Sequence, residues 1–210
     1  MNELYTKAAA FLKNTLNGCE KIDNIEKQYR YEHSMRVANI ASYIAKQEGQ
    51  DITITTVAAI LHDVGKFETD INADHGRVSA DVAMTFLEKS GLTDKQIKDI
   101  HYAIATHVDG KAGYDYENTP EAETVSDADN IDRFGVYRIY QTMQYDKADT
   151  TPAVDLANMY HERNIKRKDF KENYKLSTDT ANKLFQRHLQ IQADFFDNLV
   201  SELKETTIPQ

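Results

Sequence analysis

The chain has little cysteine, little proline and no long apolar run, and each absence excludes a class of protein. Cys19 is the only cysteine among 210 residues, which excludes a disulfide framework and a thiolate zinc site. A metal ion would have to be held by His, Asp or Glu, and the composition favours the cytoplasm. The N-terminus, Met1 to Tyr5, lacks the basic and apolar regions of a signal peptide, and no stretch approaches the ~18 apolar residues of a membrane span. We therefore expect neither export nor membrane insertion.

The chain also lacks an excess of positive charge. Its net charge is −9, from 25 Lys and Arg against 34 Asp and Glu, which opposes non-specific binding to a nucleic-acid backbone. Only three prolines occur, Pro120, Pro152 and Pro209, so long helices are permitted almost everywhere. With 40% hydrophobic and 28% charged residues, the chain suits one soluble domain with a sizeable core.

Apolar residues recur at helical spacing along most of the chain, and the expected elements are helices. The segment 51–57 alternates like a strand, but no second run could pair with it, so we interpret it as an extended approach to a helix capped near Thr55 or Thr56. Further helices are expected at about 3–16, 32–47, 77–90, 94–107, 120–132, from 152 onward and 178–203. The N-terminal cap of the helix at 94 is a capping box that starts at Thr93, and Thr119 caps the helix at 120.

The segment 58–66 places an adjacent histidine and aspartate inside a stretch that otherwise predicts a buried helix. An unpaired carboxylate in an apolar environment carries a large desolvation penalty, and a metal ion with a neighbouring imidazole removes it. We therefore predict that His62 and Asp63 are metal ligands. Lys66 follows as a cation next to the predicted ion.

Two more ligand candidates lie on inward faces of other predicted helices. His33 precedes Val37 by four residues and shares its apolar face, where a histidine alone would be interpreted as a hydrogen-bonded core residue. Asp129 follows Val125 by four residues and projects from the side that buries valine. Four ligands from three helices can thus surround one ion, and mixed imidazole and carboxylate ligation suits Mn²⁺, Fe²⁺, Co²⁺, Ni²⁺ or Zn²⁺.

Several other polar residues have open interpretations. His107 continues an apolar helix face, whereas His101 fits a core polar group and a site residue equally well. Asp127 and Asp132 lie on other sides of their helix, where they would either support the ligands or be exposed, and we favour exposure. The basic segment 161–175 is interpreted as a solvated loop in preference to a lip that attracts phosphate, and the aromatic stripe of the last helix as core packing or a homodimer contact.

The ordered set of motifs resembles the HD-domain metal-dependent phosphohydrolases, a family named for the adjacent His-Asp pair. The matching motifs are His33-Ser34-x-Arg36-Val37, Leu61-His62-Asp63-Val64-Gly65-Lys66, His75-Gly76-x-x-Ser79-Ala80, Ile104-x-x-His107 and Asp127-Ala128-Asp129-Asn130-Ile131-Asp132. The C-terminal helix, which starts Thr178-x-x-Ala181, is similar to that of a bacterial subgroup of nucleotide pyrophosphohydrolases.

The resemblance implies an all-α, single-domain helical bundle over residues 1–210. Its motif core would span about 25–135, and C-terminal helices 152–205 would pack on that core. It also implies that one divalent ion, with Mn²⁺ as the first choice, is bound by the side chains of His33, His62, Asp63 and Asp129.

The resemblance further implies hydrolysis of a phosphoester or phosphoanhydride bond in a small phosphorylated substrate, a nucleotide. One such reaction converts a (d)NTP to a (d)NMP and pyrophosphate. Asp63 would serve this reaction as a ligand, while Lys66, His75 and His107 would hold phosphate or move a proton. The segment Val64-Gly65-Lys66-Phe67 lacks the acidic pair of the hydrolases that act on the stringent-response alarmone, so this substrate is disfavoured.

Two alternatives remain open at the level of the sequence. The first is an oxygenase of the same fold, in which His75, His101 and His107 hold a second iron. The second is a noncatalytic, nucleotide-binding regulatory module.

Overall fold

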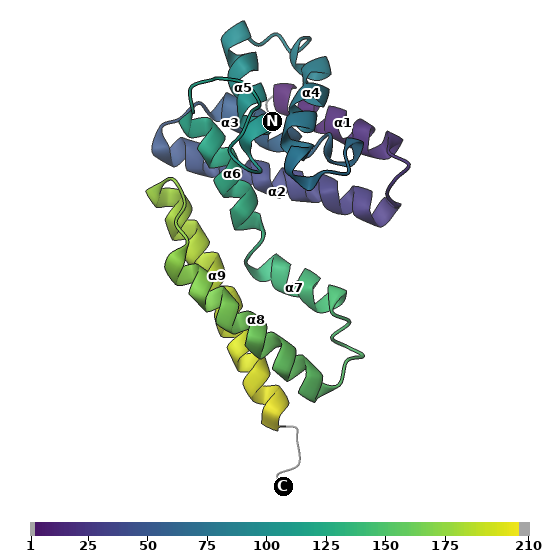
Figure 1. Ribbon diagram of the computed structural model, residues 1–210, viewed down its shortest axis with the longest axis vertical. Helices are drawn as coiled ribbons and strands as arrows, with labels where there is room; N and C mark the ends of the chain where they lie inside the picture. Colours follow the sequence, from purple (N-terminus) through teal and green to yellow (C-terminus); the bar gives the residue numbers. More distant parts are fainter. Residues whose placement is uncertain (1–2, 206–210) are drawn as a thin grey trace. The chain divides into compact units, whose positions relative to one another are not determined.

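The computed structural model describes residues 3–205 of the chain, and these form an all-α protein, which confirms the predicted fold class. Met1 and Asn2 of the N-terminal segment and Pro209 lie outside the described residues. Every helix among residues 3–205 is too short or too polar to cross a membrane. The elements, shown in Figure 1, are α1 (Glu3–Gly18), α2 (Asn24–Glu48), α3 (Ile52–Leu61), η1 (Lys66–Glu68), η2 (Asn72–Asp74), α4 (His75–Leu87), α5 (Asp94–Thr106), α6 (Pro120–Asp132), α7 (Val136–Tyr145), α8 (Ala153–Asn173) and α9 (Asp179–Glu205).

The chain divides into two compact units, Met1–Asp132 (unit 1) and Arg133–Gln210 (unit 2). Unit 1 contains every motif of the predicted site, whereas unit 2 contains α7, α8 and α9. A single domain, with the C-terminal helices packed on the motif core, stays a prediction.

Unit 1 is built around α3, which is apolar on all sides. Every residue from Ile54 to Leu61 is buried, and the side chains of Ala58 and Ala59 are fully covered. Such small residues allow close approach of neighbouring helices, and α2, α5 and α6 all pack against α3 (Figure 1). The end of α3, where His62 follows, therefore lies in the centre of the unit.

Helix caps explain where the predicted boundaries were wrong. The expected connection before Glu32 is instead the first part of α2, because the Asp23 side chain accepts a hydrogen bond from the Glu26 amide and caps the helix. Likewise, α3 begins at Ile52 rather than near Thr55, because the Asp51 carboxylate accepts bonds from the next amides, and burial outweighs the strand-like alternation of this segment. The capping box at Thr93 is confirmed.

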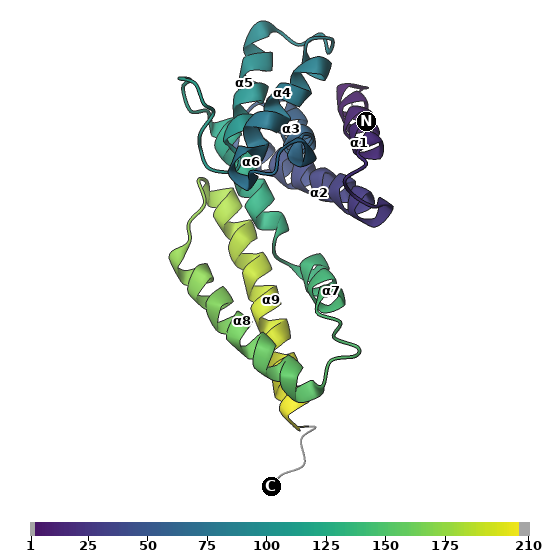
Figure 2. The ribbon, with the colours of Figure 1, turned by 45° about the vertical axis from the view of Figure 1, so that its right-hand side comes forward.

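Unit 2 is a layer of helices with an aromatic core. Helices α8 and α9 run side by side (Figure 2), and the fully buried rings of Tyr160 and Phe196 meet between them with centroids 4.6 Å apart. The stripe of α9 is therefore core packing. The basic segment was wrongly expected to be a loop: it is helical up to Asn173, and Lys168 pairs with Asp197 of α9.

Candidate metal centre

Two glycines allow the segments that carry the candidate residues to come together. After α3 the chain turns at Gly65, whose amide donates to Ser79 Oγ of α4 over 3.0 Å. A Cβ atom on Gly65 would lie 2.9 Å from the Ser79 backbone, and one on Gly76 would lie 2.7 Å from the Ala105 carbonyl oxygen of α5. Both positions thus require glycine for close packing, which brings His75 at the start of α4 beside the end of α3.

The four predicted ligands meet at the end of α3. His33 Nε2 of α2 lies 3.2 Å from His62 Nε2 and 3.1 Å from Asp129 Oδ1 of α6. Asp63 Oδ2 lies 3.8 Å from His33 Nε2 and 3.7 Å from His62 Nε2. The Asp129 side chain is 28% exposed, so one side of the cluster faces solvent, while the other three side chains are buried.

The second oxygen of Asp63 faces a different pair of rings. Asp63 Oδ1 lies 3.2 Å from His75 Nε2 and 3.7 Å from His107 Nε2, and these two nitrogens are 3.2 Å apart. The Lys66 ammonium donates to both oxygens of Asp63, at 3.2 and 3.1 Å. The residues thus form two groups with metal-ligand spacing, namely His33, His62 and Asp129, and His62, Asp63 and His107.

Hydrogen bonds from Nδ1 to backbone carbonyl oxygens fix the orientation of three of the four rings. The Nδ1 atoms of His62 and His107 lie 2.8 and 2.7 Å from the carbonyl oxygens of Ala59 and Ile104. His75 Nδ1 donates in the same way to the Asn72 carbonyl. Because a carbonyl oxygen only accepts, the proton of each of these rings sits on Nδ1, and the Nε2 lone pair points into the cluster.

The surroundings of His62 and His33 shift the pKa values of these two rings in opposite directions. Burial lowers the pKa of His62 to about 4, so this ring is neutral. Burial also disfavours the charged form of His33, but hydrogen bonds to the carboxylates of Asp129 and Asp132 raise its pKa to about 9. The pKa of Asp63 is held well below its ordinary value, because the neighbouring imidazoles and Lys66 outweigh its desolvation.

This arrangement fits a divalent cation. Because His75 and His107 each donate from Nδ1 to a carbonyl oxygen, their Nε2 lone pairs face one another across 3.2 Å, which is repulsive unless a cation or proton lies between them. The donor set consists of imidazole nitrogens and carboxylate oxygens, which suits a divalent transition metal. The side chains that would hold the ion are those of His33, His62, Asp63 and Asp129.

One supporting residue was wrongly expected to be exposed. Asp132 is buried: it accepts the Nδ1 proton of His33 over 2.8 Å and two bonds from the Arg36 guanidinium, at 2.8 and 3.0 Å. Asp127 is buried too. Sequence spacing could have indicated this role of Asp132. Asp132 follows Asp129 by three residues, and Arg36 follows His33 by three residues. Residues three apart lie on the same side of a helix.

A second cation beside the cluster was not predicted. The Arg30 guanidinium donates from Nε to Glu26 Oε1 over 2.7 Å, and its Nη1 lies 3.6 Å from Asp63 Oδ2. Its Cζ atom is 5.1 and 5.8 Å from the ring centroids of Tyr29 and Phe67. Its position three residues before His33, one helical turn away on the same face, was the available signal.

His101 lies apart from these groups. Its Nδ1 is 2.9 Å from the Tyr114 hydroxyl, and its Nε2 is 3.4 Å from Asp81 Oδ1. Among residues 3–205, His101 is in neither group with metal-ligand spacing, so the structure does not bring it together with His75 and His107 as the oxygenase alternative required.

Comparison with known proteins now places this geometry in a family. The family model described as HD domain matches residues 30–133. The chain contains an HD domain. Its match lies within the predicted motif core and includes all of the side chains that meet at the end of α3.

Solved structures share the fold of the HD-domain chain. A predicted HD superfamily hydrolase from an uncultured Thermotogales bacterium aligns over 94% of this chain and 91% of its own, with a TM-score of 0.67 and 20% identity. YpgQ of Bacillus subtilis, solved in complex with ADP, aligns over 95% of both chains, with a TM-score of 0.64 and 19% identity. Similarities at this level of identity show the fold.

Curated relatives match a shorter part of the HD-domain chain. Ribonuclease Y 1 of Pediococcus pentosaceus is 32% identical over 79 residues, which are 37% of this chain and 14% of that protein. Ribonuclease Y of Oleidesulfovibrio alaskensis is 35% identical over 77 residues, 36% of this chain and 13% of that protein. The chain thus matches about one seventh of the length of these relatives.

Proposed function

We propose that this HD-domain protein is a metal-dependent phosphohydrolase that cleaves a phosphoester or phosphoanhydride bond of a nucleotide. The observation that carries the proposal is the convergence of His33, His62, Asp63 and Asp129 beside the cations of Lys66 and Arg30. Cleavage of a (d)NTP to a (d)NMP and pyrophosphate is one reaction of this class.

A divalent ion held by these four side chains would supply Lewis acidity and lower the pKa of water. The chain's own residues would supply the rest. Lys66 and Arg30 lie beside Asp63 and are placed to neutralise charge on phosphoryl oxygens. The Arg30 guanidinium is held by a hydrogen bond from Nε to Glu26 and by the rings of Tyr29 and Phe67. His75 and His107, each fixed through Nδ1, are placed to hold or move a proton at Nε2.

Support for a nucleotide substrate comes from chemistry and from one fold neighbour. Two cations next to a metal centre fit a substrate with more than one phosphate charge. YpgQ of Bacillus subtilis, whose fold this chain shares, was solved in complex with ADP. The net charge of −9 argues against a long nucleic acid as substrate. We therefore do not extend the similarity to ribonuclease Y to RNA cleavage by this chain.

The test is turnover of a nucleotide panel by protein reconstituted with Mn²⁺. Ribo- and deoxyribonucleoside mono-, di- and triphosphates would be separated by liquid chromatography, with phosphate and pyrophosphate assayed directly. The Asp63→Asn variant serves as the control against contaminating phosphatases. No turnover with Mn²⁺, Fe²⁺, Co²⁺, Ni²⁺ or Zn²⁺ would reject the proposal, and tight nucleotide binding without turnover would instead indicate a regulatory module.

The role of Lys66 can be tested in the same assay. Lys66→Met should raise KM or lower kcat by about tenfold, because a charge-assisted contact to phosphate contributes roughly 1.5–3 kcal/mol. Lys46→Met is the matched control, because Lys46 is exposed on α2. Equal kinetics of both variants would remove Lys66 from the machinery.

A second candidate function is a di-iron oxygenase of the same fold. The observation in its favour is that Asp63 faces two pairs of rings, with Oδ2 towards His33 and His62 and Oδ1 towards His75 and His107. Two irons per chain together with oxygen uptake would favour the oxygenase. One ion per chain with Mn²⁺-dependent hydrolysis would exclude it.

A further inference from the structure

A pocket of about 330 Å³ lies on unit 1 at the outer side of α5. The side chains that line it come from α4, from α5 and from the loop between α5 and α6, and none of them belongs to the metal centre: Met84, Ile97, Lys98, His101, Tyr114 and Tyr116. A volume of this size is at the lower end of small-molecule sites.

The pocket and the metal centre lie on different sides of α5. His101 lines the pocket, whereas His107 in the metal centre follows six residues later. Six residues correspond to about 9 Å along a helix and to about 240° around its axis. The pocket is therefore a separate site.

Hydrogen bonds hold the aromatic wall of the pocket in place. The Tyr116 hydroxyl donates to Asp99 Oδ1 over 2.7 Å, and Lys95 pairs with the other oxygen of this buried carboxylate. The Tyr114 hydroxyl lies 2.9 Å from His101 Nδ1, while His101 Nε2 faces Asp81. Because Asp81 can only accept, the Nε2 atom carries the proton and Tyr114 is the donor to Nδ1.

The same bonds define what the pocket offers to a ligand. The two tyrosine rings stand at 69° to each other with centroids 6.4 Å apart, so a planar ring can stack on one and meet the edge of the other. Met84 and Ile97 add apolar surface, and a thioether packs well against an aromatic ring. Burial raises the pKa of Tyr114 to about 12, and the hydrogen bond to Asp99 raises the pKa of Tyr116 to about 12, so both hydroxyls stay neutral.

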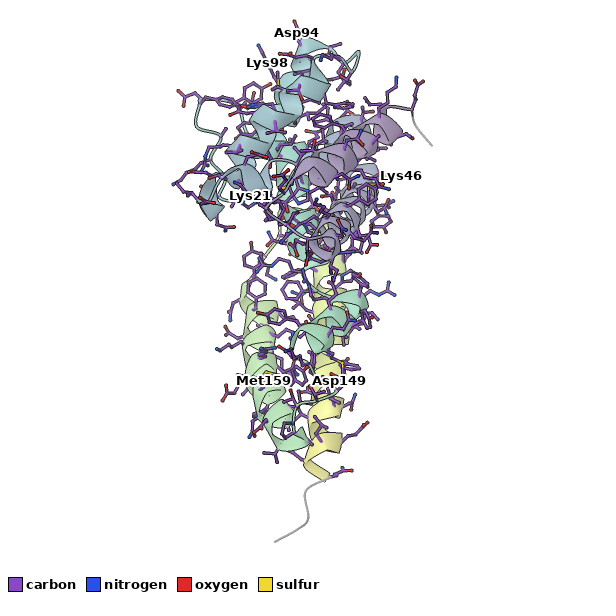
Figure 3. All side chains as sticks on the ribbon, turned by 90° about the vertical axis from the view of Figure 1, so that its right-hand side faces the viewer. Lys21, Lys46, Asp94, Lys98, Asp149 and Met159 are labelled. Carbon is purple, nitrogen blue, oxygen red and sulfur yellow. The ribbon has the colours of Figure 1, made fainter. Side chains whose placement is uncertain are left out.

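Lys98 is the remaining polar group of the pocket. The side chain is exposed and takes part in no ion pair among residues 3–205, in contrast to Lys95 one turn earlier. Figure 3 places it near Asp94, at the end where α5 begins. The hydroxyls of Tyr114 and Tyr116 and the ring of His101 form hydrogen bonds within the protein. The Lys98 ammonium can therefore form an ion pair with one negative group of a ligand.

We propose that this pocket binds a small planar aromatic anion, namely a carboxylate with one or two rings. The ring lies against Tyr114 and Tyr116, and the carboxylate pairs with Lys98. A ligand bound there contacts the loop that directly follows His107, so it restricts the backbone next to the metal centre.

The experiment measures binding of indole-3-acetate and of uncharged 3-methylindole to the full chain by saturation-transfer NMR titration. Lys98→Met should weaken indole-3-acetate about fivefold and leave 3-methylindole within twofold, because an exposed ion pair contributes up to about this factor. Lys46→Met, on an exposed lysine of α2, should change neither.

Two variants at Tyr114, whose side chain is on the surface of the fold, separate the ring from the hydroxyl. Tyr114→Ala should weaken both ligands about tenfold, whereas Tyr114→Phe should keep both within about twofold, with unchanged far-ultraviolet circular dichroism in each case. The proposal is overturned if neither ligand saturates below 5 mM, if Lys98→Met and Lys46→Met behave alike, or if choline binds more tightly than indole-3-acetate.

Discussion

Buried polar side chains occur in both units of the molecule, and their surroundings differ. In unit 2, the buried Asn164 of α8 donates to the Ala193 carbonyl and to Asp197 of α9, so its amide protons are used to join two helices. In unit 1, the buried rings use only Nδ1 for such bonds and turn Nε2 towards other Nε2 atoms and Asp63.

The two units also differ in net charge, and unit 1 is the acidic one. Residues 1–132 contain 13 Lys and Arg and 23 Asp and Glu, whereas residues 133–210 contain 12 and 11. Unit 1 thus combines an acidic composition with acceptor atoms that face one another, which a bound cation would compensate. In unit 2 the Asn164 amide thus serves helix packing, whereas the rings of unit 1 turn Nε2 towards one another and towards Asp63.

The largest effect is expected from the core of unit 2. Phe196→Ala should lower the free energy of unfolding by about 3–5 kcal/mol, because it removes a fully buried ring that contacts Tyr160. Urea denaturation measures the loss, and Tyr145→Ala at an 87% exposed ring is the control. The content of bound Mn²⁺ should stay unchanged. Loss of the ion in Phe196→Ala would contradict the inference that ion binding depends on unit 1 alone.

The next effect concerns a candidate ligand in unit 1. Asp129→Ala should reduce bound Mn²⁺ and lower hydrolysis by at least about 100-fold, since even residues that only support metal ligands contribute 10- to 100-fold. Plasma mass spectrometry and circular dichroism would report ion content and helix content. Asp149→Ala, at an exposed aspartate of unit 2, should change neither. An unchanged ion stoichiometry in Asp129→Ala would reject Asp129 as a ligand.

A smaller effect is expected when the support of His33 is weakened. Asp132→Asn keeps the side-chain shape but removes the charge that holds His33 Nδ1–H and Arg36, so Mn²⁺ affinity should fall about 10- to 100-fold. Titration calorimetry measures the affinity. The matched control is Asp197→Asn, because Asp197 accepts a comparable 2.8 Å bond from Asn164 in unit 2. Equal affinities in both variants would show that Asp132 has only a packing role.

The smallest effect is the pH dependence of ion binding. The pKa of His33 in the metal-free protein is raised to about 9, so the ion has to displace a proton at neutral pH. Affinity for Mn²⁺ should therefore rise by about tenfold per pH unit from pH 6.5 to 7.5, measured by calorimetry.

The stability of the metal-free protein should change in the opposite direction. A raised pKa in the folded state stabilises the protein fully below the ordinary value of 6.5, and this contribution is lost as pH rises through about 9. The contribution should be absent in the variant His33→Gln. An affinity for Mn²⁺ that does not vary with pH would contradict the protonated state of His33.

Helical faces were the part of the structure that local sequence could predict. His33 and Asp129 were placed on inward faces by their spacing from apolar neighbours, and His62 by the apolar segment around it. The structure brings these three side chains together. The positions of Asp132 and Arg30 were not predicted, because their partners lie far away in sequence: His33 and Asp132 are 99 residues apart. Helix α7 was missed as well, and its exposed residues Val136, Tyr137 and Tyr140 leave Ile139 as its one buried residue.

The sequence by itself determined the all-α class, the presence of an HD domain and the inward faces of the helices, because periodicity is a local property of the chain. Only the tertiary structure decided that Asp63 faces two pairs of rings, that Asp132 supports His33 and that His101 lines a pocket of its own. Those facts depend on the distances between helices that are far apart in sequence. Such distances are set by close packing at Gly65 and Gly76 and by the small side chains of α3.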